Sequence, residues 1–319
     1  MKEKLNEELI SAITHQLSEG NNIVAFLSEI LTMGKPSVYR RLRGEVLFTF
    51  EEVFLITQKL NISMDNIIGI RNVKRAIYDL SLPQTDYLYD KYYEILEDYV
   101  QIFQKMGEDP ASKVRLACNT LPYAFFLRHK NLSKFRLFRW INQNTRQQQL
   151  VPFSRIEVPQ NIWDMQDQYA WGIENARSAH LILDSNTFSS FIQDVAYFAR
   201  LKLLTKEETE QLKQELFSLL DDLETKAIHG CHSNGNEVLI YLSQIDIKTS
   251  YAYFECKNSM VCDLWVYAMN GISSLNPQIC EIQKEWIESL RRYSMLISRS
   301  GEMQRTEYLE CQRDCVRTL

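Results

Sequence analysis

The feature that most constrains the fold of this chain is a series of helix start and stop signals in its first seventy residues. Thr49 and Glu52 have the T-x-x-E spacing of a capping box, and Phe48 and Val53 flank it at the positions of a hydrophobic staple. Pro36 suits the first turn of a preceding helix, where its missing N–H has no intrahelical partner. These signals predict a compact bundle of five short helices over residues 1–70.

Apolar residues at helical spacing predict which side of each helix is buried. They are Leu5, Leu9, Ile13 and Leu17 in the first helix, Ile23, Leu27, Ile30 and Leu31 in the second, Val38 and Leu42 in the third, and Val53, Phe54, Ile56 and Leu60 in the fourth. Ser63 is expected to cap a fifth helix that Gly69 closes.

Two motifs in this region carry a resemblance to a known family. The step "LSEIL" leads into "TMGKPSVYRRLRG", which follows the pattern S-x-[ST]-V-x-R-x-x-x-G at Ser37, Val38, Arg40 and Gly44, and "NISMDNIIG" follows the ending N-V-S-x-D-x-[LI]-[LI]-G. Residues 23–69 therefore resemble the helix-turn-helix domain of Cro/CI-type (Xre-like) bacterial and phage repressors. Two positions depart from the family: Thr32 replaces the usual turn glycine, and Arg41 replaces a commonly apolar residue.

The resemblance implies that the third helix enters the major groove of double-stranded DNA. Lys35 and Ser37, at its N-terminal end, are then the first candidates for reading bases. Tyr39 and Arg40 follow on the outward side, and Arg40 is able to make bidentate contacts to guanine or phosphate. Arg43, at the helix end, is better placed for a backbone phosphate. Without the resemblance, the same cations would read as a solvated face.

The charge balance indicates how such a domain would bind. Residues 1–70 contain seven Lys and Arg against nine Asp and Glu, a net charge of −2, and the whole chain has a net charge of −5. Non-specific coating of nucleic acid is therefore disfavoured, and one copy should bind DNA modestly. We expect a homodimer that reads a palindromic operator.

Residues 71–85 are predicted to be a linker, and residues 86–319 an α+β region that dimerises, senses a small-molecule or protein effector, or does both. A stripe with heptad-like spacing is either a short coiled-coil seam between subunits or an ordinary core stripe: Leu88, Tyr92, Ile95, Tyr99, Ile102 and Met106. The segment "RHKNLSKFRLFRW" mixes cations and aromatics, as in a site for nucleic acid or an anionic ligand, and as in an amphipathic helix, which we favour. Thr205 and Glu208 form another capping box.

Strand-like runs gather towards the C-terminus. "EVLIYLSQIDI", "SYAYFEC" and "MVCDLWVYAM" are predicted to form three antiparallel strands with hairpins near Lys248 and at residues 257–259, and "SKVRLAC" and "SAHLILD" to add strands. A long helix follows from Pro277, with an inner side of Ile279, Ile282, Trp286, Leu290, Tyr293 and Leu296. The expected fold is mainly α: a five-helix helix-turn-helix bundle, then an α+β domain with a small antiparallel sheet and long flanking helices.

Several function classes find no support in the sequence. No apolar run reaches the length of a membrane span and no export signal is present, so we expect a cytoplasmic protein with reduced cysteines. "HGCH" has no second ligand cluster, and no phosphate loop or catalytic motif occurs, so neither a metal, a cofactor nor an enzyme is expected. We read the chain as a DNA-binding transcriptional regulator. The alternatives are a protein–protein adaptor with a repressor-like bundle, and an enzyme with a fused DNA-binding module.

Overall fold

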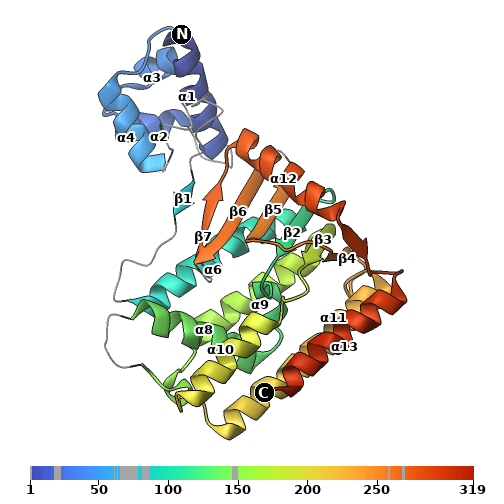
Figure 1. Ribbon diagram of the computed structural model, residues 1–319. Helices are drawn as coiled ribbons and strands as arrows, with labels where there is room; N and C mark the ends of the chain where they lie inside the picture. The colour runs from blue at the N-terminus through green and yellow to red at the C-terminus, as the bar shows by residue number, and fades with distance from the viewer. Residues whose placement is uncertain are drawn as a thin grey trace. The chain divides into compact units, whose positions relative to one another are not determined.

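The structure is a computed structural model that describes residues 2–17, 23–60, 62, 64, 78–80, 87–145, 150–257, 259–267 and 270–319. The chain divides into two compact units, Met1–Ile77 and Tyr78–Leu319, called unit 1 and unit 2 below (Figure 1). The predicted fifth helix and most of the predicted linker lie outside the described residues.

Unit 1 contains four described helices around a single core. They are α1 (Lys2–Leu17), α2 (Ile23–Ile30), α3 (Lys35–Leu42) and α4 (Phe50–Leu60). The predicted stripes supply most of that core, including Leu9, Ile13, Leu27, Val38 and Ile56. Two predicted core positions are wrong, because 42% of Leu5 and 57% of Phe54 are exposed.

Unit 2 corrects the predicted fold class. Its helices are α6 (Leu88–Gly107), α7 (Tyr123–Phe126), α8 (Lys130–Asn144), α9 (Gln160–Asn175), α10 (Ser189–Arg200), α11 (Lys206–His229), α12 (Pro277–Arg291) and α13 (Glu302–Arg317), with a 3-10 turn at Phe153–Arg155. Its strands are β1 (Asp79–Leu80), β2 (Lys113–Cys118), β3 (Ser178–Leu183), β4 (Glu237–Ser243), β5 (Ser250–Cys256), β6 (Ser259–Tyr267), β7 (Asn270–Ser274) and β8 (Ser294–Leu296). In the described residues these strands form one eight-stranded mixed sheet in the order β1-β7-β6-β5-β2-β3-β4-β8.

The predicted small antiparallel sheet is therefore wrong, and so is the three-stranded meander. The middle of the sheet is parallel, since β2 pairs with β3 and β3 pairs with β4 in the same direction. The predicted hairpin near Lys248 does not form: β4 pairs with β8, while β5 pairs with β2 on the other side. The predicted second hairpin is present, with Cys256 paired to Ser259. In unit 1 the described residues comprise four helices and do not by themselves establish the predicted five-helix helix-turn-helix bundle.

The two faces of the sheet are covered unequally (Figure 1). Alternate residues of β2 point to opposite faces. Val114, Leu116 and Cys118 join the large core formed with helices α6 to α11 and α13. Ala117 joins a smaller core with α12 on the opposite face. The helices that connect β2 to β3 and β3 to β4 cover the same face, as expected when successive parallel crossovers share one hand.

The large core explains the heptad-like stripe of α6. Tyr92, Ile95 and Met106 are buried in it, and α6 packs along α9. At Gly172 of α9, a Cβ atom would lie 2.5 Å from Cβ of Phe103, so only glycine permits this close approach. The coiled-coil seam between subunits is therefore wrong, and the alternative of a core stripe is confirmed.

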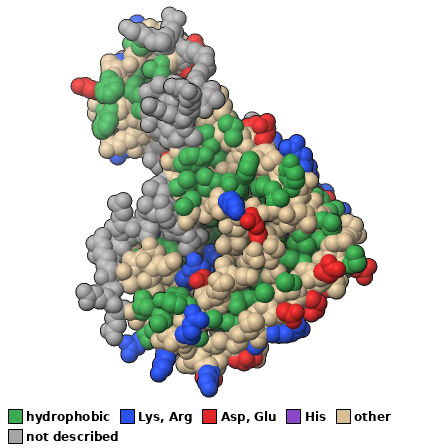
Figure 2. Space-filling model, in the orientation of Figure 1, with side chains coloured by type: hydrophobic (Ala, Val, Ile, Leu, Met, Phe, Trp, Pro, Cys, Tyr) green, Lys and Arg blue, Asp and Glu red, His purple; other side chains and the backbone are tan. Residues whose placement is uncertain are grey.

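The predicted inner side of the last long helix is partly wrong. In α12 the buried residues are Cys280, Gln283, Ile287 and Leu290, whereas Ile282 and Trp286 are exposed. Hydrophobic side chains accordingly gather on the outer surface over α12 and the neighbouring strands (Figure 2). The buried Gln283 fits this face because its side-chain amide donates to the backbone carbonyls of Ala252 and Asp263 at 2.7 and 2.8 Å. The buried residues of α12 have helical spacing, as predicted, but they lie on a different side of the helix, which includes the hydrogen-bonded Gln283.

Candidate functional site: the outer surface of α3

One buried side chain fixes the orientation of α3. Val38 is fully buried in the core of unit 1, and Leu42, one turn later, packs against that core. Pro36 lies in the first turn, as predicted. Gly44 has φ +74° and ends the helix in the left-handed conformation, and the N–H of Glu45 donates to the carbonyl of Arg40 at 2.9 Å. The side of the helix opposite Val38 is thereby turned to solvent.

The residues proposed for DNA contact are all exposed, and Arg40 and Arg43 lie on the side of α3 away from Val38. Lys35, Ser37, Tyr39, Arg40 and Arg43 are exposed. The side chains of Arg40 and Arg43 are 60% and 65% exposed. Residues one turn apart on a helix are neighbours, so positions 35 and 39 adjoin, as do positions 39 and 43. The surface thus offers two guanidinium groups, an ammonium group and a phenol within two turns.

One acidic residue at this surface is not among the residues predicted from the sequence. Glu45 lies 3.5 Å from Nε of Arg40 and 3.1 Å from Nε of Arg43. Its carboxylate therefore partly neutralises both arginines. The signal was the position of Glu45 directly after the helix-ending Gly44, where the turn folds its side chain back towards the last turn of α3.

Arg41 has a different partner, which accounts for a cation at a commonly apolar position. Its guanidinium donates two hydrogen bonds to the carboxylate of Glu52, at 2.7 and 2.9 Å, and both side chains are only 15% exposed. Glu52 also accepts from the N–H of Thr49, whose hydroxyl accepts from the N–H of Glu52, so the predicted capping box is confirmed. Burial by itself would raise the pKa of Glu52, but these hydrogen bonds and the Arg41 charge hold that pKa below its ordinary value. Arg41 thus links α3 to α4 rather than facing a ligand.

Thr32 keeps the backbone geometry expected of the missing turn glycine. Its φ is +49°, in the left-handed region that a β-branched residue rarely adopts. The N–H of Met33 donates to the carbonyl of Ser28 at 3.2 Å, which closes the turn between α2 and α3. The departure therefore adds backbone strain and leaves the turn in place.

Other classes of site receive no positive support within the described ranges. No group of three or more His, Cys, Asp or Glu residues is placed there to hold a metal ion. None of the helices described is both long and apolar enough to cross a bilayer. The segment "HGCH" begins at His229, the last residue of α11, and the seven cysteines are free thiols.

Comparison with known proteins adds no relative. No known family, no curated protein and no solved structure matches this chain.

Proposed function

We propose that the protein is a sequence-specific DNA-binding transcriptional regulator that docks α3 in the major groove. The observation that carries the proposal is the two-sidedness of this short helix. Val38 is fully buried on one side, while Arg40 and Arg43 are exposed on the other. A helix whose inward side is fixed by a core presents its outward side rigidly, as base reading requires.

In this proposal the exposed side chains contact different parts of the DNA, according to their position along the helix. Lys35 and Ser37, at the N-terminal end, reach base edges, with Tyr39 and Arg40 beside them. Arg43, at the C-terminal end, binds a backbone phosphate and fixes the register. Phosphates compete with Glu45 for Arg40 and Arg43, so each copy binds weakly and a homodimer on a palindromic operator supplies the remaining affinity.

The test begins with selection from random double-stranded DNA by the full-length chain. Affinity for the enriched sequence is then measured for Arg40→Ala and Glu45→Gln over a range of salt concentrations. Arg40→Ala should weaken binding by about 5- to 150-fold, the loss typical of a base contact. Glu45→Gln should strengthen binding several-fold, because it frees two arginines.

A matched control separates a local effect from a change in total charge. Arg128→Ala removes another arginine, 55% exposed and paired with Glu174, from unit 2. Its affinity should equal that of the wild type. If Arg40→Ala and Arg128→Ala bind alike, α3 is not the DNA-binding surface.

A second candidate function, a protein–protein adaptor, is favoured by one observation. Phe50 and Phe54 of α4 are 83% and 57% exposed, and hydrophobic side chains are visible on the surface of unit 1 (Figure 2). Exposed aromatics at i and i+4 form a ridge suited to a protein partner. Absence of enriched DNA at every salt concentration, together with loss of a co-purifying partner on Phe50→Ser, would favour the adaptor.

A further inference from the structure

Unit 2 contains a polar cavity of about 300 Å³ at the end of β2. Asn119 and Thr120, which directly follow β2, form one wall, and Lys248 and Thr249, which directly precede β5, form another. Ser190, in the first turn of α10, closes a third side. The volume is at the lower end of the range for small-molecule pockets. Sheets with parallel strands commonly bind ligands beyond the carboxyl ends of those strands, which is where this cavity lies.

The walls are held by specific hydrogen bonds. The segment 244–249 crosses the ends of β3 and β2, and there the N–H of Ile247 donates to the buried carboxylate of Asp184 at 2.9 Å. The hydroxyl of Ser250 donates to the side-chain carbonyl of Asn119 at 2.9 Å. These contacts fix the cavity before any ligand arrives, which lowers the entropic cost of binding.

The ionisable side chains that line the cavity are all cations: Arg136, Arg139 and Lys248. Arg139 is paired with Asp194 of α10, and Lys248 is paired with the exposed Asp246 at 3.0 Å. The walls therefore present positive charge, and the two acids that compensate part of it do not line the cavity.

Arg136 differs from the other two cations. Its guanidinium lies 4.9 Å from the ring centre of Phe126 and 5.7 Å from that of Tyr123. Within the part of the chain that the structure describes, no carboxylate comes within 4.0 Å of it. Burial, and then the like charge of Arg139, lower the pKa of Arg136 below its ordinary value. Arginine nevertheless stays charged, and the carboxylate of Asp194, which pairs with Arg139, acts on this partly desolvated charge only from beyond 4.0 Å.

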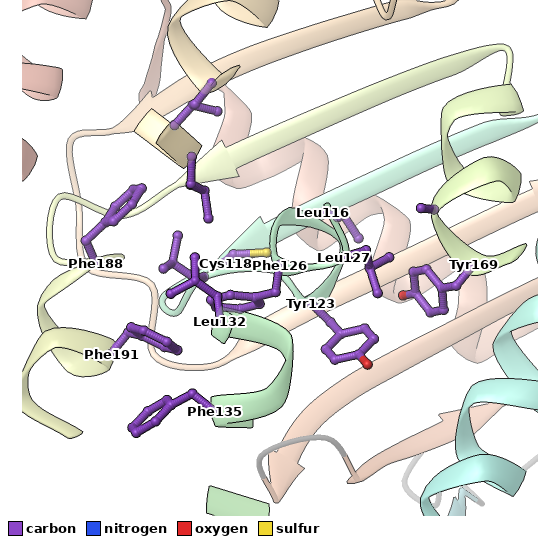
Figure 3. Packing of buried hydrophobic residues seen from close by; sticks show 14 of the residues in the cluster. Leu116, Cys118, Tyr123, Phe126, Leu127, Leu132, Phe135, Tyr169, Phe188 and Phe191 are labelled. Carbon is purple, nitrogen blue, oxygen red and sulfur yellow. The ribbon is translucent and has the colours of Figure 1, made fainter. Parts of the chain in front are cut away.

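An aromatic recess extends the cavity from Arg136 into the core. A smaller space of about 20 Å³ shares Thr120, Arg136 and Trp265 with the cavity and adds Tyr99, Tyr123 and Tyr169. Figure 3 shows Tyr123 and Tyr169 among the buried residues of the large core, and their ring centres are 5.5 Å apart. Burial raises the pKa of all three tyrosines, so these phenols stay neutral and do not neutralise Arg136.

We propose that this cavity is a binding site for a small organic anion whose carboxylate or phosphate group pairs with Arg136. Arg139 and Lys248 add positive charge, and Thr120, Ser190 and Thr249 supply hydroxyl groups for the same oxyanion. The recess of about 20 Å³ has room for little more than one water molecule, so the less polar end of the ligand lies in the main cavity, beside Phe191 and Trp265. This site assigns a role to the basic and aromatic segment of α8, and it is independent of DNA binding by unit 1.

The test measures thermal unfolding of the full-length protein without DNA, at constant ionic strength. Inorganic phosphate, succinate and benzoate are titrated separately, with chloride as the balancing anion. At ten times its Kd, a ligand for this site should raise the unfolding temperature of unit 2 by roughly 3–6 °C, in a saturable manner. A response to phosphate alone or to carboxylates alone identifies which oxyanion the site prefers.

Three variants separate the site from a general effect of anions. Arg136→Gln should lose the response while its unfolding temperature without ligand is unchanged or higher, because an unpaired cation has been removed. Lys248→Gln, at an exposed position, should keep the fold and raise Kd a few-fold. Arg128→Gln, outside the cavity, should respond like the wild type. The proposal is overturned if none of the three anions gives a saturable shift, or if Lys248→Gln and Arg136→Gln both respond like Arg128→Gln.

Discussion

The two units differ in where their incompletely neutralised charged side chains lie. In unit 1 Arg40 and Arg43 are on the surface, and the neighbouring Glu45 partly neutralises both of them. In unit 2 a cation, Arg136, and an acid, Asp263, are enclosed by aromatic side chains and strands. Surface charge suits a partner as large as DNA, whereas enclosed charge suits a small ligand or a proton.

The largest expected effect tests whether the two cores are independent. Phe138 is fully buried, and its ring centre is 4.8 Å from that of Phe198 and 5.6 Å from that of Phe153. Phe138→Ala should cost unit 2 about 3–5 kcal/mol, and Leu27→Ala, at a fully buried position, should cost unit 1 about 2–5 kcal/mol. Scanning calorimetry of the full chain should show that each variant lowers one of two transitions. A single transition that both variants lower would mean that the cores unfold together.

The next effect concerns the buried acid of unit 2. Burial raises the pKa of Asp263 from 3.8 to about 7, although a hydrogen bond from Tyr99 opposes the shift. Between these two values the folded state keeps a proton that the unfolded state has lost. This residue should therefore decrease the stability of unit 2 as pH rises from about 4 to 7, by up to roughly 1.4 kcal/mol per pH unit, with no further change above pH 7.

The measurement is the difference in unfolding free energy between the wild type and Asp263→Asn across that range. The difference is needed because His180 and His232, whose burial lowers their pKa to about 4, produce the opposite slope in both proteins. Unit 1 provides the contrast: the lowered pKa of Glu52 adds stability that is present above pH 4.5 and lost as pH falls below it. A difference curve for Asp263→Asn that is flat from pH 4 to 7 would contradict the raised pKa.

Unit 1 and unit 2 also differ in how far the sequence predicts them. The start of α3 at Lys35, the capping box of Thr49 and the burial of Val38 follow from local signals, because caps and helical spacing act within one or two turns. The order of the strands in unit 2 does not follow from such local signals. β2 and β3 are neighbours only because α7 to α9 cross back over the sheet, and nothing within "SKVRLAC" encodes that pairing.

The two candidate sites also differ in how far the sequence predicts them. The exposed cations of α3 lie close together in the sequence, so they could be identified before the structure, whereas the only signal for the pairing of Glu45 with two of them is its position directly after Gly44. The cavity in unit 2 combines Thr120, Arg136, Ser190 and Lys248, which come from four separate segments. The mixture of cations and aromatics in α8 is visible in the sequence, but there an amphipathic helix is favoured over a ligand site. Only the topology distinguishes Arg136 from an ordinary surface arginine.

The smallest expected effect concerns Thr32, in the turn between α2 and α3. Glycine adopts positive φ without the cost of roughly 1–2 kcal/mol that a side chain incurs, but it loses more entropy on folding. Thr32→Gly should therefore stabilise unit 1 by a net amount of about 0.5–1 kcal/mol, measured from its calorimetric transition. Thr14→Gly is the matched control, because Thr14 lies within α1, where glycine should cost a few tenths of a kcal/mol. If both substitutions destabilise unit 1 equally, the turn stores no strain at Thr32, and its departure from the repressor pattern has no energetic consequence.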